Sequence, residues 1–321
     1  MTEGFGRVLV TGGAGFIGGH LVDALLAGGA ERVVVVDTFF LGHDHNLEAA
    51  REAGGDRLVV HREDAADRDA MAEICRQERP DVVFNLATKA LLYSFFNPAG
   101  ACRVNLDIAL TLCELQRAGA FGRLVHSSSS EVYGTARFVP MTEDHPLEAE
   151  TTYAAGKAAA DLAVASYVRM FDLDAVTVRP FNNYGPRQNE GAFAAVIPLT
   201  VKRILDGEQP VLQGDGSQTR DFIFVRDSVD AMLRIAASPV RGETFNVGSG
   251  RETSIATIVD TVVRHLAWDG GIRHEPERTA DVKRHCAGVE RAEQLVGPLA
   301  TTPLDEGLAE TIDWYVERRQ R

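Results

Sequence analysis

The sequence predicts an α/β protein with a doubly wound parallel sheet and a smaller second domain. From residue 7 to about residue 179, short apolar runs of strand length alternate with longer segments of helical periodicity. This alternation is typical of a parallel sheet with crossover helices. The chain has 321 residues, whereas one hydrophobic core rarely serves more than about 250 to 300. We therefore expect a large first domain and a smaller domain after it.

Six apolar runs predict the strands of the large domain. They are RVLVT (7–11), RVVVVD (32–37), RLVVH (57–61), DVVFNLA (81–87), RLVHSSS (123–129) and DAVTVRP (174–180). Helices are expected over 20–27, which Gly28 and Gly29 terminate, and over 101–118 and 154–170. The last two helices are apolar around much of their circumference. They should pack on the sheet and on a second surface, either within the chain or in a homodimer.

The character of the chain changes after Arg179. The segments FNNYGPRQNEG and LQGDGSQTRDF are rich in Gly, Asn and Gln, and we interpret them as site-forming loops. A helix over 226–236 and a strand at ETFNVGS (243–249) then restore the earlier alternation. We predict a large domain of residues 1–180 joined by about 222–250, and a smaller domain of residues 181–221 and 251–321. In the smaller domain, Ser254 should cap a helix that runs to Leu266, and a terminal helix should span 303–319.

Composition and charge disfavour several classes of protein. The 46 acidic residues outnumber 33 basic ones for a net charge of −13, which disfavours nucleic acid and anionic membranes as partners. No apolar run approaches the ~20 residues of a membrane span, and the N-terminus lacks the features of an export signal. The four cysteines form no CxxC pair, and His43 and His45 lack a third ligand at metal spacing. We expect a cytoplasmic protein without a metal site.

A glycine-rich turn predicts a dinucleotide site. Gly13-x-Gly15-x-x-Gly18 directly follows the first predicted strand and opens a helix, and Asp37 ends the second strand 19 residues after Gly18. In this context the glycines let the backbone approach a pyrophosphate at the helix N-terminus. Asp37 should accept hydrogen bonds from the adenosine ribose and repel a 2′-phosphate, which favours NAD over NADP. The alternative interpretation is a plain tight turn with a solvated aspartate.

A tyrosine and a lysine predict redox chemistry on a hydroxyl group. Tyr153 and Lys157 are four residues apart in a predicted helix, so both side chains project from one face. A nearby ammonium favours the phenolate form of tyrosine, which could take a proton from a hydroxyl while hydride leaves the same carbon. Four consecutive serines, Ser127 to Ser130, follow a predicted strand at the edge where doubly wound sheets bind ligands. Packing of the tyrosine on the lysine stem and an ordinary serine-rich loop are the alternatives.

Several motifs in order carry a resemblance that covers nearly the whole chain. TGGAGFIG, NLAT, SSSSEVYG, YxxxK, RPFNNYGP, QGDGSQTRDF and FNVGSG resemble the extended short-chain dehydrogenase/reductases, specifically the NAD-dependent nucleotide-sugar epimerase/dehydratase family. The resemblance implies a Rossmann fold and a bound NAD that is recycled within each turnover. It also implies Tyr153 as the base, Lys157 lowering its pKa, and Ser129 as the hydroxyl that contacts the substrate. Nucleoside diphosphate sugars are the implied substrates, with UDP-sugars favoured.

Three sets of site residues follow from the motifs and the resemblance. The catalytic set is Tyr153, Lys157, Ser129, Glu131 and Ser130. The cofactor set is Gly12, Gly15, Phe16, Ile17, Gly18, Asp37, Asp64, Ala65, Leu86, Ala87 and Ser127, with Tyr153 and Lys157. The substrate set is Lys89, Asn182, Arg187, Val211, Arg220, Arg278 and Asp281, with Lys89 facing either substrate or cofactor.

Glu131 points to the reaction type. Family epimerases commonly carry a small or hydroxyl residue at this position, whereas dehydratases and uronate decarboxylases commonly carry Glu. A C4 ketone acidifies the C5 hydrogen, which Glu131 could remove so that the C6 substituent is expelled. Ser130 departs from the Asp-Glu pair of the dTDP-glucose type of dehydratase and resembles GDP-mannose dehydratases. The segment from Glu131 to Leu147 also resembles N-acetylhexosamine dehydratases, so the sequence favours a dehydratase.

Three other functions stay open at this point. A 4-epimerase would need only the Tyr153 chemistry. A UDP-uronate decarboxylase is disfavoured because two acids in EAETT, Glu148 and Glu150, precede Tyr153 and should repel a uronate. A non-catalytic NAD-binding sensor is the remote alternative, since dinucleotide folds also serve ligand sensing. The intact Tyr153, Lys157 and serine turn argue against such a sensor.

Overall fold

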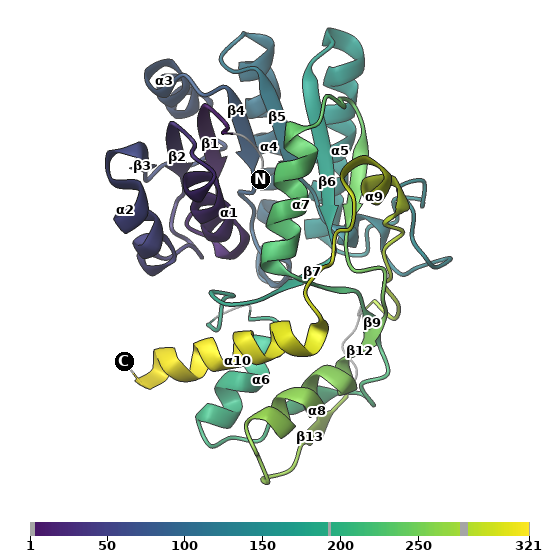
Figure 1. Ribbon diagram of the computed structural model, residues 1–321. Coiled ribbons are helices and arrows are strands. Elements are labelled where there is room, and N and C mark those ends of the chain that lie inside the picture. Colours follow the sequence, from purple (N-terminus) through teal and green to yellow (C-terminus); the bar gives the residue numbers. More distant parts are fainter. Residues whose placement is uncertain (1–3, 192–193, 277–281, 321) are drawn as a thin grey trace.

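The computed structural model describes residues 4–191, 194–276 and 282–320. Its core is a seven-stranded sheet in which every neighbouring pair of strands is parallel (Figure 1). The strand order is β11-β6-β5-β4-β1-β2-β3. The strands are β1 (Arg7–Thr11), β2 (Arg32–Val36), β3 (Leu58–His61), β4 (Val82–Asn85), β5 (Arg123–Ser127), β6 (Asp174–Pro180) and β11 (Thr244–Val247). The predicted doubly wound sheet is confirmed, including the return of residues 243–249 to its edge.

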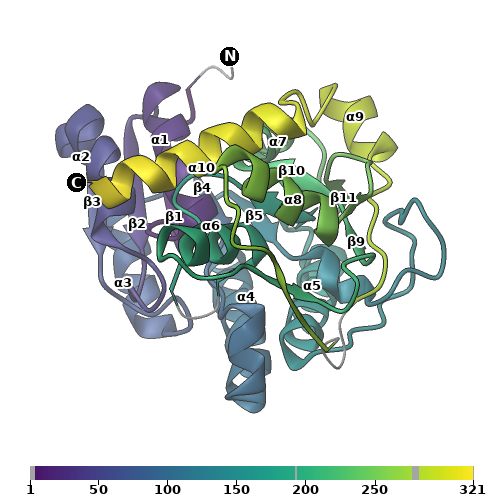
Figure 2. The same cartoon turned by 90° about the horizontal axis from the view of Figure 1, so that it is seen from below.

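Helices cover both faces of the sheet, as Figure 2 shows with the sheet seen from below. In β1, Val8 and Val10 belong to one apolar cluster and Leu9 belongs to the other, because successive side chains of a strand point to opposite faces. Helices α1 (Phe16–Ala27) and α7 (Val225–Ala237) contribute to the first cluster. Helices α3 (Arg68–Glu78), α4 (Pro98–Arg117) and α5 (Thr152–Phe171) contribute to the second. Burial on both faces explains why the strands read as continuous apolar runs.

Several helices and one strand differ from the sequence prediction. Helix α1 begins at Phe16 rather than at residue 20, and β5 ends at Ser127, so Ser128 and Ser129 lie in the following loop. Helix α3 was not predicted, although Asp67 caps it and its buried residues have helical spacing. Other short elements also went unpredicted: α2 (Glu48–Gly54) and the 3-10 helices η1 (Asp44–Leu47), η2 (Gly55–Arg57), η3 (Leu91–Phe95) and η4 (Ser130–Tyr133).

Helices α4 and α5 pack closely against each other as well as on the sheet. The side chain of Asn97 caps α4 through the amide of Gly100, and that of Thr151 caps α5 through the amide of Ala154. This packing provides the second surface that their apolar circumference requires. Leu162 and Met170 of α5 nevertheless remain 58% and 70% exposed. The homodimer stays a prediction.

Within its described residues, the smaller part of the molecule carries three helices and three two-stranded sheets (Figure 1). Helix α10 (Leu304–Gln320) packs against α6 (Val196–Leu205) and α8 (Ile255–His265), which Ser254 caps as predicted. The sheets pair β7 (Asn182–Tyr184) with β10 (Phe222–Phe224), β8 (Val211–Gln213) with β13 (Arg273–Glu275), and β9 (Thr219–Arg220) with β12 (Thr253–Ser254). Helix α9 (Glu290–Val296) instead packs against α7 and β11, although the predicted division assigned these residues to the smaller domain.

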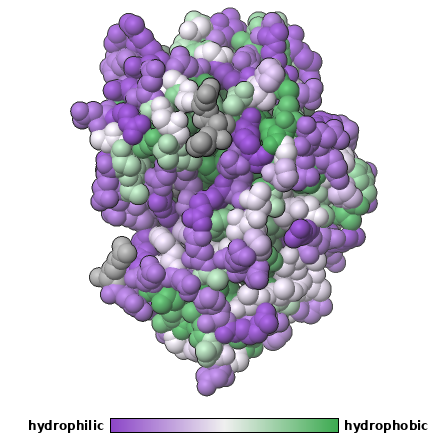
Figure 3. Space-filling model, in the orientation of Figure 1, coloured by the Kyte–Doolittle hydropathy of each residue, from purple (hydrophilic) through white to green (hydrophobic). Residues whose placement is uncertain are grey.

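The surface is predominantly hydrophilic on the face seen in Figure 3, with apolar residues scattered in small groups. This distribution agrees with the net charge of −13. Among the residues that the structure describes, no helix combines the length and the apolar character needed to cross a membrane.

Candidate active site

A cavity of about 760 Å³ lies between the large domain and the smaller part of the molecule. Its wall includes the loops that follow β1, β2, β3, β4 and β5, where the carboxyl ends of parallel strands meet. The opposite wall comes from α6, β7, β8, β9 and β13. We call these two walls the cofactor half and the substrate half of the cavity.

The glycine-rich loop of the cofactor half has room for backbone only. Gly12 adopts a φ of +71°, and a Cβ there would lie 2.8 Å from the amide nitrogen of Ala87. A Cβ on Gly18 would overlap the carbonyl oxygen of Gly12. Gly15 is the N-cap residue of helix α1, which has no side-chain cap and no acid in its first turn. Its first amides therefore remain available to an anion, as a pyrophosphate requires.

Asp37 directly follows β2 and lines the same half of the cavity. Its carboxylate accepts hydrogen bonds from the amides of Ala14 at 3.0 Å and Phe39 at 2.7 Å. Two carboxylate oxygens offer about four acceptor sites, so acceptor capacity remains for ribose hydroxyls. Burial raises the pKa of Asp37, and the two amide hydrogen bonds oppose that rise. These residues fit a dinucleotide with an unphosphorylated adenosine ribose.

Two residues of the predicted substrate set lie toward the cofactor half. The Lys89 ammonium stands 3.7 Å from the ring centroid of Phe40, and its charge lowers the pKa of Asp37. This position favours the cofactor alternative for Lys89. Arg187 lines the cavity, but its guanidinium donates to Asp23 of α1 at 2.6 Å and to the carbonyl of Asn46 at 3.1 Å. It thereby ties the loop after β7 to the cofactor half.

The predicted catalytic pair lies at the junction of the two halves. Tyr153 and Lys157 occupy adjacent turns of α5, and both are buried. Lys157 Nζ donates to the carbonyl of Ser127 at 2.8 Å. Burial raises the pKa of Tyr153 to about 12, while hydrogen bonds with Ser129 and Thr88 oppose this rise. Burial lowers the pKa of Lys157 to about 8.

Ser130 and Glu131 also line the cavity, in the 3-10 helix η4. The Ser129 hydroxyl caps this helix by accepting from the Glu131 amide at 3.3 Å. The Glu131 carboxylate is close enough to Tyr153 for its charge to raise the pKa of the phenol. The structure therefore brings a carboxylate close to Tyr153, and Ser130, the residue before Glu131, is 3% exposed.

The substrate half is lined by both polar and apolar side chains from separate elements. Asn182 of β7, Val211 of β8 and Arg220 of β9 were predicted, and all three line the cavity. The sequence analysis missed Thr88, Arg203, Gln213, Arg273 and Glu275, which also line it. Thr88 directly follows NLA, so its place after a strand was a usable signal. Gln213 opens the motif QGDGSQTRDF but was assigned no role, and the other three lie on α6 and β13, which carry no recognised motif.

The structure brings together all predicted site residues that it describes. The glycine loop, Asp37, Asp64, Ala65, Leu86, Ala87 and Ser127 line the cavity with the catalytic and substrate sets. Arg278 and Asp281 lie outside the described residues. His43 and His45, which have no third ligand at metal spacing in the sequence, stack their rings with centroids 4.9 Å apart.

Comparisons with known proteins agree with this arrangement. The model of the NAD dependent epimerase/dehydratase family matches residues 8–248. A UDP-glucose 4-epimerase of Mycolicibacterium smegmatis is 34% identical, over 98% of this chain and 100% of the relative. A dTDP-glucose 4,6-dehydratase of Neisseria gonorrhoeae is 32% identical, over 100% of this chain and 98% of the relative. The crystal structure of a dTDP-glucose 4,6-dehydratase from Streptomyces venezuelae with NAD bound superimposes with a TM-score of 0.91 at 31% identity, covering 98% of both chains.

Proposed function

The chain belongs to the NAD-dependent epimerase/dehydratase family and uses NAD, and within this family we propose that it is a nucleotide-sugar dehydratase. The substrate is a nucleoside diphosphate hexose, with a UDP-sugar favoured, and the reaction passes through a 4-keto intermediate. The observation that carries this proposal is Glu131, a carboxylate in the cavity whose charge acts on Tyr153. A 4-epimerase requires no second base beside the tyrosine.

The first step oxidises C4 of the sugar. Bound NAD supplies the hydride acceptor for C4 and later the hydride donor for C6. Tyr153 takes the proton of the C4 hydroxyl, and Ser129 and Thr88 hold that phenolic oxygen in position. The buried ammonium of Lys157 favours the phenolate. Together the three groups explain how a phenol works as a base in this cavity.

The second step removes water across C5 and C6. The 4-keto group acidifies the C5 hydrogen, which Glu131 takes as a proton while the C6 hydroxyl is expelled. The expelled hydroxyl is protonated to water from solvent, to which Tyr153 releases the proton that it took from the C4 hydroxyl, so the protons balance over one turnover. After hydride reaches C6, Glu131 returns a proton to C5. The sugar loses one water, NAD is regenerated, and the product is a 4-keto-6-deoxy sugar. Ser130, buried beside Glu131, is available to hydrogen-bond the leaving oxygen.

Glu131→Gln tests this assignment because it keeps the shape of the side chain and removes its basicity. We expect the variant to oxidise the sugar and then stall, so that reduced nicotinamide and a 4-keto sugar accumulate. Elimination should slow by ~10²- to 10⁴-fold, the usual contribution of a positioned general base. The measurement is nicotinamide absorbance with mass spectrometry of the sugar, over a panel of UDP-, dTDP- and GDP-hexoses.

Glu150→Gln is the matched control. Glu150 is an exposed acid whose carboxylate accepts from the Thr135 amide at 2.9 Å, and it does not line the cavity. This variant should turn over at the parent rate. In the parent enzyme run in heavy water, deuterium should appear at C5 of a product that has lost one water. A product of unchanged mass with no deuterium at C5 would overturn the dehydratase and favour the 4-epimerase.

The 4-epimerase is the second candidate. It is supported by the 34% identity to a named UDP-glucose 4-epimerase and by the absence, at position 130, of the aspartate that the dTDP-glucose type of dehydratase carries. The sequence argument against a decarboxylase was that Glu148 and Glu150 should repel a uronate. The structure does not support this argument. Glu148 pairs with Arg137, Glu150 binds the Thr135 amide, and neither lines the cavity. Loss of carbon dioxide from a uronate would identify that reaction in the same panel.

A further inference from the structure

A row of buried polar side chains lies beneath the cavity and follows the order of the strands. Hydrogen bonds join Thr11 of β1 to Asn85 of β4 at 2.8 Å, and Asn85 to Nδ1 of His126 in β5 at 3.0 Å. His126 Nε2 then lies 3.6 Å from a carboxylate oxygen of Asp161 in α5. The other oxygen of that carboxylate accepts from Arg179 of β6 at 2.9 Å. All of these residues are at most 6% exposed.

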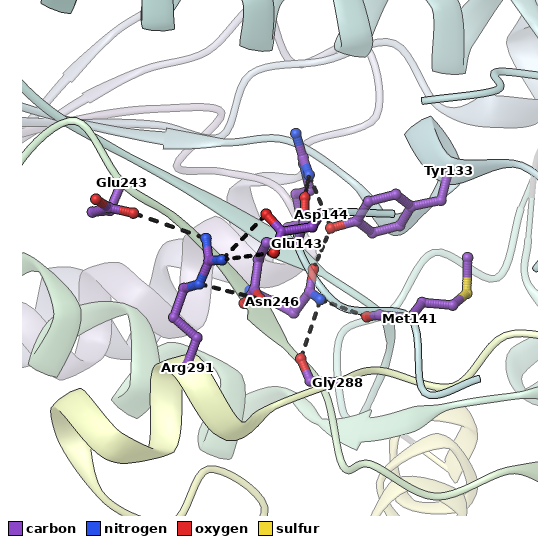
Figure 4. Close-up of polar contacts among 9 residues, drawn as sticks. Tyr133, Met141, Glu143, Asp144, Glu243, Asn246, Gly288 and Arg291 are labelled. Carbon is purple, nitrogen blue, oxygen red and sulfur yellow. Dashed lines mark hydrogen bonds and ion pairs between the residues drawn. The ribbon is translucent and has the colours of Figure 1, made fainter. Parts of the chain in front are cut away.

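At the far end of the row, hydrogen bonds around Tyr133 and Asn246 join several segments of the chain (Figure 4). The hydroxyl of Tyr133 accepts from Arg179 at 2.9 Å and donates to Asn246 of β11 at 2.7 Å. The Asn246 amide group donates to the carbonyls of Met141 and Gly288, and its backbone amide donates to Glu143. Arg179 therefore has a fixed position, and it fixes the carboxylate of Asp161 in turn.

Asp161 stands one helical turn after Lys157, on the same face of α5. Within the described residues, no hydrogen bond or ion pair joins the two side chains directly. Lys157 Nζ instead donates to the Ser127 carbonyl. The carboxylate still acts through its charge, because it opposes the fall in the pKa of Lys157 that burial causes. The same charge raises the pKa of Tyr153.

The charged and titratable groups around this pair come from every neighbouring element. His126 of β5, Arg179 of β6 and Glu131 of η4 act on Asp161 or Tyr153. Beyond them, Glu143 contacts Arg179 through its carbonyl. Burial lowers the pKa of His126, and Asp161 opposes that fall. Nδ1 of His126 is hydrogen-bonded to Asn85, so Nε2 is the ring nitrogen that faces Asp161. Asp161 is thus an anion between two cations, Lys157 and Arg179.

We propose that Asp161 is a positioning residue of the reaction, whose carboxylate, anchored by Arg179, keeps the Lys157 ammonium charged beneath Tyr153 and thereby sets the pH range of sugar oxidation. The inference rests on the first step of the proposed function, hydride removal from C4. That step is common to a dehydratase and a 4-epimerase. The role of Asp161 is therefore independent of the choice between these two reactions.

Asp161→Asn tests the inference through the pH profile of a single turnover. Enzyme with bound NAD is mixed with the nucleotide sugar that the parent enzyme oxidises best, and the rate of nicotinamide reduction is followed over pH. The step needs Tyr153 as phenolate and Lys157 as ammonium, so the rising and falling limbs of the parent profile report the pKa values of these two groups. Removing the negative charge lowers the pKa of both groups. Both limbs should therefore move to lower pH by about one unit or more, with the KM of the sugar unchanged.

Two further variants separate charge from packing. Asp161→Glu keeps the charge, so its limbs should stay at the parent positions even if the rate falls. Arg179→Gln removes the opposing cation, so its limbs should move to higher pH. Asp174→Asn is the matched control, because Asp174 pairs with Arg123 between the same two strands at the end remote from the cavity, at 2.7 Å. Its profile should equal that of the parent.

A lower rate in Asp161→Asn with both limbs unmoved would overturn the proposal, because a structural role alone changes the amplitude and leaves the limbs in place. If Asp161→Asn does not fold, Arg179→Gln decides: an upward shift supports the proposal and an unmoved profile overturns it. Nicotinamide reduction by the parent enzyme tests the first step of the proposed function separately from the position of the limbs.

Discussion

The cofactor half and the substrate half of the cavity are built in different ways. The cofactor half consists of loops that each directly follow a strand of one parallel sheet, so the ladder of hydrogen bonds fixes their relative positions. The substrate half is assembled from strands of two or three residues in separate two-stranded sheets, together with α6. The glycine loop of the first wall presents backbone to the cavity, whereas the second wall is lined by side chains from separate elements.

This difference teaches where specificity can vary. A backbone wall tolerates few changes, because any added atom meets main chain that cannot move alone. A side-chain wall can change its ligand by single substitutions while the fold stays intact. The three variants below probe the two walls in turn, from the largest expected effect to the smallest.

Gly18→Ala should give the largest loss, because the new Cβ would overlap the carbonyl oxygen of Gly12. Overpacking of this kind costs up to about 3 kcal/mol, or about 100-fold in NAD affinity. The measurement is the NAD released on denaturing the purified protein, which we expect to be near stoichiometric for the parent. Gly29→Ala controls for a general loss of stability, since the φ of +84° strains an alanine there although its Cβ meets nothing within 4 Å. Its NAD content should equal that of the parent. If Gly18→Ala released as much NAD as the parent, the loop would be able to shift and accommodate the added Cβ, contrary to our inference.

Asp37→Ala probes a side chain in the cofactor half and should have a smaller effect. The change removes hydrogen bonds from a charged acceptor, so we expect NAD affinity to fall by ~1 to 3 kcal/mol. Titration of stripped enzyme with NAD and NADP measures both the loss and the discrimination. NADP binding should improve relative to NAD, because the repulsive charge is gone. Unchanged affinity for both would remove Asp37 from the ribose site.

Arg220→Gln should have the smallest effect, confined to the substrate half. Glutamine keeps a donor and loses the charge, so the KM of the nucleotide sugar should rise by ~5- to 30-fold, about 1 to 2 kcal/mol. NAD content should equal that of the parent, because Arg220 of β9 stands across the cavity from the glycine loop. A simultaneous loss of NAD would show that the two halves are coupled.

Much of the cofactor half was predictable from the sequence because its determinants are local. Gly12, Gly18, Asp37 and the predicted strands are read from short segments, in which a turn, a helix start and a strand end follow one another. The NAD cofactor and the family are confirmed by the comparisons. The pair Tyr153 and Lys157 was readable for the same reason, since helical spacing alone puts both side chains on one face.

Only the tertiary structure decided the contacts between distant segments. In the folded chain Arg187 donates a hydrogen bond to Asp23, and Glu148 and Glu150 do not line the cavity. Helix α9 packs against the large domain. The tertiary structure also aligned Asn85, His126 and Arg179 beneath the cavity, because strand order brings together residues that stand more than forty positions apart in the chain. Pattern and spacing act over a few residues, so the sequence by itself determined the elements and their local chemistry. The charges that surround each group depend on which elements pack together, and the folded chain alone determines that.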